Sequence, residues 1–162
     1  MASDDRRHDS AARPARILLV DDSSITRIIV GRGLKSAGML IEEARDGAEA
    51  LQLLTANAYD VVISDLSMPG IDGFAVLAGA RMQPVPPEVI ILSGSEDIQR
   101  AMDALRLGAH AYLAKPPAHP DEVLLTVRRA LEMKRLRERC ALLEEEATPR
   151  RARAARSRAA AA

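Results

Sequence analysis

The chain has 162 residues, 48% of them hydrophobic, so it can bury one core and has little room for a second domain. Its 23 basic and 23 acidic residues balance, but residues 15–120 hold nine basic and thirteen acidic side chains, whereas residues 147–162 hold five arginines and no acid. The single cysteine, Cys140, excludes an internal disulfide framework, and no apolar stretch approaches the roughly 20 residues of a membrane span. We therefore expect one cytoplasmic domain with tails.

Short apolar runs alternate with helix-like segments along the chain. Each run is bounded by polar or turn-forming residues, which is typical of buried strands. The expected strands are 17–20, 39–44, 61–64, 88–92 and 109–114. Helices should begin after Ser23, Asp46 and Asp72, whose side-chain oxygens can cap a first turn. A fourth helix is expected at 96–107 and a long last helix at about 120–146.

Apolar spacing predicts the faces of two of these helices. In the first, one face is marked by Ile25, Ile28, Ile29, Gly33 and Leu34. In the fourth, the residues expected to point inward are Ile98, Met102 and Leu105.

The order of the elements predicts the fold class. Alternating strands and helices favour a parallel sheet with right-handed crossovers and helices on both faces. Strands covered on both faces are continuously apolar, as residues 61–63 and 89–92 are. We therefore expect an α/β fold of the (βα)5 flavodoxin-like, doubly wound type, with strand order 2-1-3-4-5 and an extended C-terminal helix.

Reactive side chains follow four of the five expected strands. They are Asp21 and Asp22 after the first, Asp65 after the third, Ser93 after the fourth and Lys115 after the fifth. Because sites in open α/β sheets lie outside the carboxyl ends of the strands, we expect these groups to converge. Three adjacent carboxylates repel one another unless a cation neutralises them, and Mg2+ prefers oxygen ligands. The cluster therefore predicts a magnesium and phosphate site.

Asp65 is the better candidate for the nucleophile of this site. Its strand is central, and the turn Leu66-Ser67 directly after it can supply a carbonyl ligand and amide donors. Asp21 and Asp22 would then hold the metal, together with Asp65 itself and the backbone carbonyl of Ser67.

Lys115 and Ser93 complete the predicted chemistry. Lys115 would place a positive charge opposite a transferred phosphoryl group, and the Ser93 hydroxyl can donate a hydrogen bond to one of its oxygens. Taken singly, the residues have ordinary explanations, since an acidic pair often caps a helix and a loop lysine is often solvated. Their joint placement at strand ends favours the site.

With these motifs, the chain resembles the receiver domain of bacterial two-component response regulators. The resemblance covers about residues 16–132. Its matching pieces are Asp21-Asp22, Asp65, Met68-Pro69-Gly70-Ile71-Asp72-Gly73, Ser93-Gly94, and Tyr112 three residues before Lys115-Pro116. One departure is Ser93, which stands where threonine is commoner in the family.

The resemblance implies a role for each matched position. Asp21 and Asp22 would bind Mg2+, Asp65 would become the acyl phosphate, and Lys115 would contact it. Ser93 and Tyr112 would be the switch residues. The donor would be a sensor histidine kinase or a phosphotransfer protein, and an unknown downstream protein would receive the signal. A cis bond is also expected between Lys115 and Pro116.

Two alternatives share parts of this pattern. An aspartate-nucleophile phosphatase also passes through an acyl phosphate, but such enzymes resemble one another in a D-x-D motif after the first strand. Here that strand ends in Asp21-Asp22-Ser23, so the general acid is missing. The second alternative is a constitutive interaction or dimerisation module whose working part is the long helix. We expect a non-enzymatic phosphoacceptor with at most slow self-dephosphorylation.

The last helix is longer than one domain of this size needs. Leu124, Val127 and Leu131 are expected to face the core. A second apolar row with 3-4-3 spacing follows, here called the seam: Met133, Leu136, Cys140 and Leu143. The change of face predicts a short coiled coil and a homodimer through this helix, with a solvated amphipathic extension as the alternative.

These features divide the chain into four expected parts. They are a disordered N-terminal arm (1–15), a receiver domain (16–132), a helical extension (133–147) and a disordered Arg/Ala-rich tail (148–162). The tail is expected to be solvated rather than to contact nucleic acid or an acidic partner, and no dedicated DNA-binding domain is expected.

Overall fold

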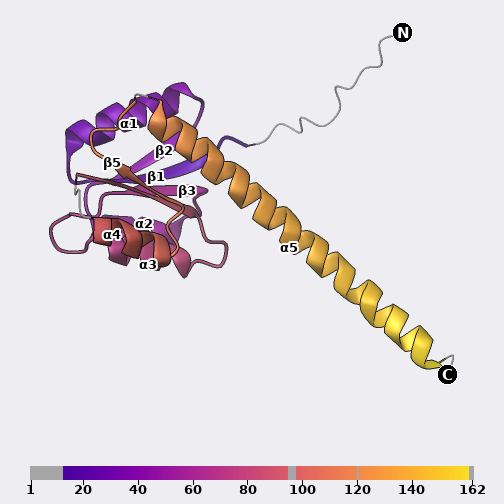
Figure 1. Ribbon diagram of the computed structural model, residues 1–162. Helices are drawn as coiled ribbons and strands as arrows, with labels where there is room; N and C mark the ends of the chain where they lie inside the picture. The colour runs from indigo at the N-terminus through magenta and orange to yellow at the C-terminus, as the bar shows by residue number, and fades with distance from the viewer. Residues whose placement is uncertain (1–12, 95–97, 120, 161–162) are drawn as a thin grey trace, which may run out of the picture.

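The computed structural model describes residues 13–94, 98–119 and 121–160, with the backbone alone for residues 146 and 148–160. Strands and helices alternate along the chain (Figure 1). The strands are β1 (Arg16–Val20), β2 (Leu40–Ala44), β3 (Val61–Ser64), β4 (Glu88–Ser93) and β5 (Ala111–Ala114). The helices are α1 (Ser24–Ser36), α2 (Gly47–Ala56), α3 (Gly73–Arg81), α4 (Ile98–Arg106) and α5 (Glu122–Ala160). All neighbouring strands are parallel, in the order β2-β1-β3-β4-β5, so the predicted fold class is confirmed.

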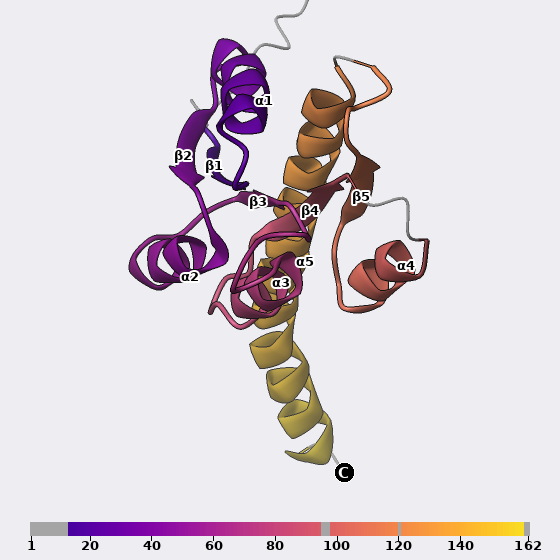
Figure 2. The same ribbon diagram turned by 90° about the vertical axis from the view of Figure 1, so that its left-hand side faces the viewer.

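Helices cover both faces of the sheet, with α1 and α5 on one face and α2, α3 and α4 on the other (Figures 1 and 2). Alternate residues of the central strands enter the two cores. Leu18, Val62 and Ile91 pack with α2 and α3, whereas Leu19, Ile63 and Ile90 pack with α1 and α5. Every residue of β3 and β4 is buried, which explains their continuous apolar sequences.

Side-chain caps begin three helices where the sequence predicted them. Ser23 accepts a hydrogen bond from the Thr26 amide, and Asp46 accepts one from the Glu49 amide. Asp72 likewise accepts one from the Ala75 amide at 3.0 Å. Because α1 and α2 begin within four residues of the ends of β1 and β2, the first two caps hold strand end and helix start together, whereas the residues between β3 and α3 form a longer loop.

The inward face predicted for α4 is wrong, and the apolar row predicted on α1 is buried only in part. Three residues of the predicted row on α1 are exposed: Ile25, Ile28 and Ile29. The residues of α1 that are buried are Val30, Gly31 and Leu34. On α4, the residues predicted to point inward are also exposed: Ile98, Met102 and Leu105. The buried residue of α4 is Ala104, because this helix lies over β5 at the edge of the sheet and a small side chain allows close approach.

Helix α5 is longer than the sequence predicted. It runs through the Arg/Ala-rich segment, for which we expected disorder, as far as Ala160. Alanine and arginine are strong helix formers, and α5 continues past Pro149 even though a proline inside a helix removes one backbone hydrogen bond. At 1.5 Å per residue its 39 residues span ~58 Å, so α5 projects far beyond the sheet (Figure 1). Of the predicted N-terminal arm, residues 1–12 lie outside the described residues, and the division into four parts stays a prediction.

Two buried carboxylates at the amino-terminal edge of the sheet hold α5 in place. Asp60 lies 3.9 Å from the Lys134 ammonium, and Arg13 donates two hydrogen bonds to the same carboxylate. Glu88, at the start of β4, pairs with Arg137 and lies 3.4 Å from His110 Nδ1. We call these contacts the edge clamp. Because both acids are buried, their pairing fixes the rotation of α5 against the sheet.

The edge clamp makes Asp60 important for stability. Asp60→Asn keeps an acceptor for the Arg16 amide but leaves the buried Lys134 ammonium without that opposite charge, so we expect the free energy of unfolding to fall by about 2 kcal/mol. The measurement is urea unfolding followed by circular dichroism. The matched control is Asp103→Asn, which removes an exposed charge paired with Arg106 and should change stability by less than about 0.5 kcal/mol. Equal effects of the two changes would contradict this role of Asp60.

Candidate functional site

The register of β1 and β3 brings the predicted carboxylates together. Val20 lies opposite Ser64 at the ends of these strands, and the Asp65 amide donates to the Val20 carbonyl at 3.0 Å. Asp21 in turn donates its amide to the Ala44 carbonyl at the end of β2. Backbone bonding therefore continues one residue past the strands and fixes both aspartates at the carboxyl edge of the sheet.

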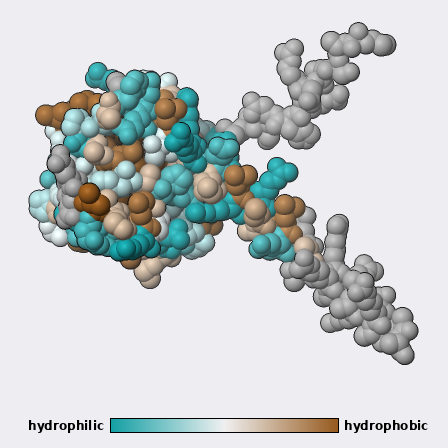
Figure 3. Space-filling model, viewed as in Figure 1, coloured by the Kyte–Doolittle hydropathy of each residue, from teal (hydrophilic) through white to brown (hydrophobic). Residues whose placement is uncertain are grey.

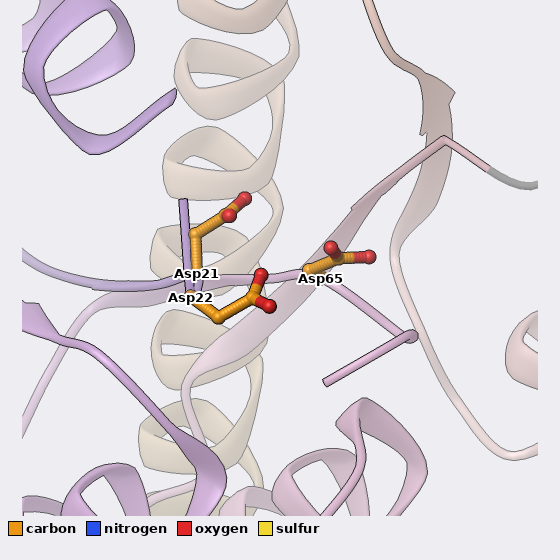
Figure 4. Close-up of side chains that lie close together, drawn as sticks. All are labelled: Asp21, Asp22 and Asp65. Atoms are coloured by element: carbon orange, nitrogen blue, oxygen red, sulfur yellow. The ribbon is translucent and has the colours of Figure 1, made fainter. Parts of the chain in front are cut away.

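Three carboxylates gather at this edge: Asp21, Asp22 and Asp65 (Figure 4). One oxygen from each lies within 4.8 Å of the others. Asp21 and Asp65 are buried, whereas Asp22 is exposed. The site therefore has a buried floor and an open side, through which a small ligand can enter from solvent.

Backbone amides orient two of these carboxylates. The Ser23 amide donates to Asp21 Oδ1 at 2.9 Å, and the Ser67 amide donates to Asp65 Oδ1 at 3.1 Å. Each aspartate thus closes a small turn onto the residue two positions later, which limits its rotation. The other oxygen of each carboxylate is directed to a cation, described next.

Lys115 bridges the two buried aspartates. Its ammonium pairs with Asp21 Oδ2 and lies 2.9 Å from Asp65 Oδ2. Burial alone would lower the pKa of Lys115, but hydrogen bonds and charge from the two aspartates outweigh it, so the pKa is raised above its usual value of 10.5. Lys115 is therefore charged at neutral pH. The expected cis bond between Lys115 and Pro116 is present.

The predicted switch residues lie on β4 and β5, beside the carboxylates. Ser93 is fully buried at the end of β4, and its carbonyl accepts a hydrogen bond from the Lys115 amide at 2.9 Å. Tyr112 is partly buried and lies opposite Ile91 in the register of β4 and β5. The backbone therefore links Ser93, Lys115 and the strand that carries Tyr112.

Arg100 lies near the site and was not predicted from the sequence. Its guanidinium donates to Ser67 Oγ at 3.2 Å and lies over the Phe74 ring, 5.7 Å from the centroid. No local motif marks Arg100, because it comes from α4, 33 residues after the serine that it contacts. The arginine adds a second positive charge on the side of the site that faces α4.

The donor set fits a magnesium ion. The three atoms that could bind the ion are carboxylate oxygens, the ligand type that Mg2+ prefers. They lie within 4.8 Å of one another, which is near the roughly 3–4 Å that separates two ligand atoms of one ion. An exposed member, Asp22, leaves room for the water molecules that Mg2+ keeps. The three carboxylates that were predicted to hold the metal therefore lie together, and the Ser67 carbonyl as a fourth ligand stays a prediction.

The fold and the carboxylate cluster agree with a comparison against protein families. The family model of the response regulator receiver domain matches residues 17–128 of this chain. The chain belongs to this family. Phosphorylation and Mg2+ binding are typical of response regulator receiver domains, and such domains are in general non-enzymatic phosphoacceptors that imply a histidine kinase partner.

Individual relatives support the same assignment. The gliding motility regulatory protein of Myxococcus xanthus is 43% identical over 110 residues, which are 65% of this chain and 14% of that protein. The C4-dicarboxylate transport transcriptional regulatory protein DctD of Pseudomonas aeruginosa is 40% identical over 125 residues, 75% of this chain and 26% of that protein. The chain therefore spans a minor part of these regulators.

A solved structure gives the same result for the receiver domain. The chemotaxis response regulator CheY4 of Vibrio cholerae superposes with a TM-score of 0.67 at 34% identity, covering 73% of this chain and 99% of that one. Among the described residues, no helix is both long and apolar enough to cross a membrane.

Proposed function

We propose that this receiver domain accepts a phosphoryl group on Asp65 in a Mg2+-dependent reaction and thereby changes which partner it binds. The observation that carries the proposal is the contact of the Lys115 ammonium with both Asp65 and Asp21 beside a third carboxylate. This arrangement offers an oriented nucleophile and positive charge at one place, which is what phosphoryl transfer requires.

The proposed transfer needs one bond change at phosphorus. A carboxylate oxygen of Asp65 attacks the phosphorus of a phosphohistidine on a sensor histidine kinase or phosphotransfer protein. The new P–O bond forms as the P–N bond breaks, and the leaving imidazole takes up a proton. Lys115, already 2.9 Å from Asp65 Oδ2, is placed to pair with the transferred phosphoryl oxygens.

Asp21, Asp22, Asp65 and the Ser67 backbone carbonyl would hold Mg2+. When bound, the ion supplies positive charge that neutralises the carboxylates and the incoming phosphoryl oxygens. Asp21 and Asp22 contribute the fixed negative charge that makes the position selective for a cation.

A groove beside the site supports the approach of a protein donor. It has a volume of about 880 Å3 and is lined by the exposed isoleucines of α1, by the start of α5 and by the loop Lys115–Pro117. Because Lys115 lies both in this groove and against Asp65, a partner seated there would lie one side chain away from the phosphoacceptor.

Ser93 and Tyr112 are the proposed switch. The Ser93 hydroxyl would turn to the phosphoryl group, and Tyr112 would move inward with it. The surface that would report this change is formed by α4, β5 and α5. Its exposed apolar residues on α4, Ile98, Met102 and Leu105, suit a downstream protein rather than water. The cytoplasmic location stays a prediction.

The experiment that tests the proposal is incubation with acetyl phosphate. We expect one phosphoryl group per chain, measured by intact-mass spectrometry, in the presence of Mg2+, and less than about a tenth of that with EDTA, because the carboxylates then repel the donor. Absence of labelling with Mg2+ would favour the constitutive module. Sustained hydrolysis of phosphomonoesters would favour the phosphatase, whereas we expect turnover at background.

A further inference from the structure

Beyond the sheet, α5 carries apolar side chains that its own domain does not cover. Of the seam, Met133, Leu136 and Leu143 are 40%, 53% and 56% exposed, and Cys140 is also exposed. Figure 3 shows brown, hydrophobic side chains interleaved with teal ones along the part of α5 that leaves the domain. The phosphoacceptor site does not use this surface.

The seam lies on a different side of α5 from the row that packs on the sheet. That inner row is Val123, Val127, Ala130 and Lys134, all buried. With 100° per residue, the centre of the seam lies roughly 130° around the helix from the inner row. The edge clamp, through Lys134 and Arg137, fixes this orientation, so the seam points away from its own domain.

The charged residues that flank the seam in one copy of the chain are complementary to those that flank it in a second copy. If Met133 and Cys140 take heptad position a, then Leu136 and Leu143 take d. The flanking g positions are Glu132 and Arg139, and the flanking e positions are Arg137 and Glu144. These residues are the ones that form ion pairs between the helices of a coiled coil.

In a parallel pair, position g faces e of the next heptad, which matches Glu132 with Arg137 and Arg139 with Glu144 of the second copy. In an antiparallel pair, g faces g and e faces e, which matches Glu132 with Arg139 and Arg137 with Glu144. Every match joins opposite charges in either direction, and the matches of Arg139 are the ones that do not involve the edge clamp, because Arg137 already pairs with Glu88 of its own domain. The pattern therefore specifies a second copy of this chain as the occupant of the seam.

We propose that two copies of this chain associate through α5, with the seam of one packed on the seam of the other as a short two-stranded coiled coil. Burial of the seam removes exposed leucine and methionine from water, which supplies the driving force. Because the edge clamp joins α5 to the sheet, the pairing also holds the two receiver domains in a fixed relation.

The first test compares two neighbouring leucines. Leu143 belongs to the seam, whereas Leu142, which is 61% exposed, lies at position c outside it. In sedimentation velocity from about 5 µM to about 500 µM, we expect the full chain to show a concentration-dependent dimer. Leu143→Glu should raise the dissociation constant at least about tenfold, and Leu142→Glu less than about threefold.

The second test uses charge at matched positions. Arg139→Glu places like charges across the interface in either direction and should weaken the dimer, whereas Arg135→Glu makes the same change at position c and should not. Added salt should reduce the difference. A chain that stays monomeric at every concentration would overturn the proposal, as would equal weakening by both members of either matched pair. All measurements use unphosphorylated protein, so failure here leaves the role of Asp65 unaffected.

Discussion

Asp65→Asn should abolish phosphorylation by acetyl phosphate, with labelling reduced to background in the presence of Mg2+. The amide of asparagine keeps an oxygen that can accept from the Ser67 amide, so the local turn is retained. It lacks the negative charge that makes the carboxylate a nucleophile and a metal ligand. The measurement is intact-mass spectrometry after incubation, with circular dichroism to confirm that the variant folds.

A matched change elsewhere controls for this substitution. Asp46→Asn likewise replaces a carboxylate by an amide, here at the N-cap of α2. Asparagine caps a helix as well as aspartate does. This variant should be labelled to the wild-type level. Wild-type labelling of Asp65→Asn would contradict the assignment of the phosphoacceptor.

Gly73→Ala should disturb both the fold and the site. A Cβ at Gly73 would lie 2.1 Å from the Asp65 carbonyl oxygen and 2.8 Å from the Leu66 Cα. Both neighbours are backbone atoms, so either the start of α3 or the Asp65 turn must move. We expect the free energy of unfolding to fall by about 3 kcal/mol and the rate of labelling by acetyl phosphate to fall at least tenfold.

Gly33→Ala is the matched control. Gly33 lies within α1, is exposed, and has no atom within 4 Å of a Cβ built on it. Alanine should therefore stabilise the chain by about 0.5–1 kcal/mol and leave labelling unchanged. Urea unfolding and the labelling rate measure both variants. Unchanged stability and labelling of Gly73→Ala would show that the contact with the Asp65 backbone does not restrain the site.

Much of the fold and of the site could be predicted from the sequence because the relevant signals are local. A buried parallel strand is a short apolar run, and the residue after it is at the carboxyl edge of the sheet. That reasoning placed Asp21, Asp65 and Lys115 together from three separate runs, and the structure brings them into contact. The helix caps Ser23, Asp46 and Asp72 are equally local and were also predicted.

The features that the sequence did not predict depend on packing between elements that are distant in the chain. Helix α1 is apolar on two sides, so spacing alone could not tell that Val30 packs on the sheet beside Leu34 whereas Ile28 is exposed. The edge clamp of Asp60 with Lys134 joins residues 74 positions apart, and no motif indicates it. After residue 147 composition predicted disorder, whereas the backbone continues α5 to Ala160, and the division of the chain into four parts stays a prediction.

The most direct test of the proposed function is to locate the phosphoryl group on the chain. Phosphorylated protein is treated with borohydride, which reduces an acyl phosphate on aspartate to the alcohol of homoserine, and the product is digested and sequenced by mass spectrometry. We expect homoserine at position 65 in the wild type, dependent on Mg2+, and at no position in Asp65→Asn. Homoserine at position 21 or 22, or none in protein that carries the phosphate, would contradict Asp65 as the phosphoacceptor.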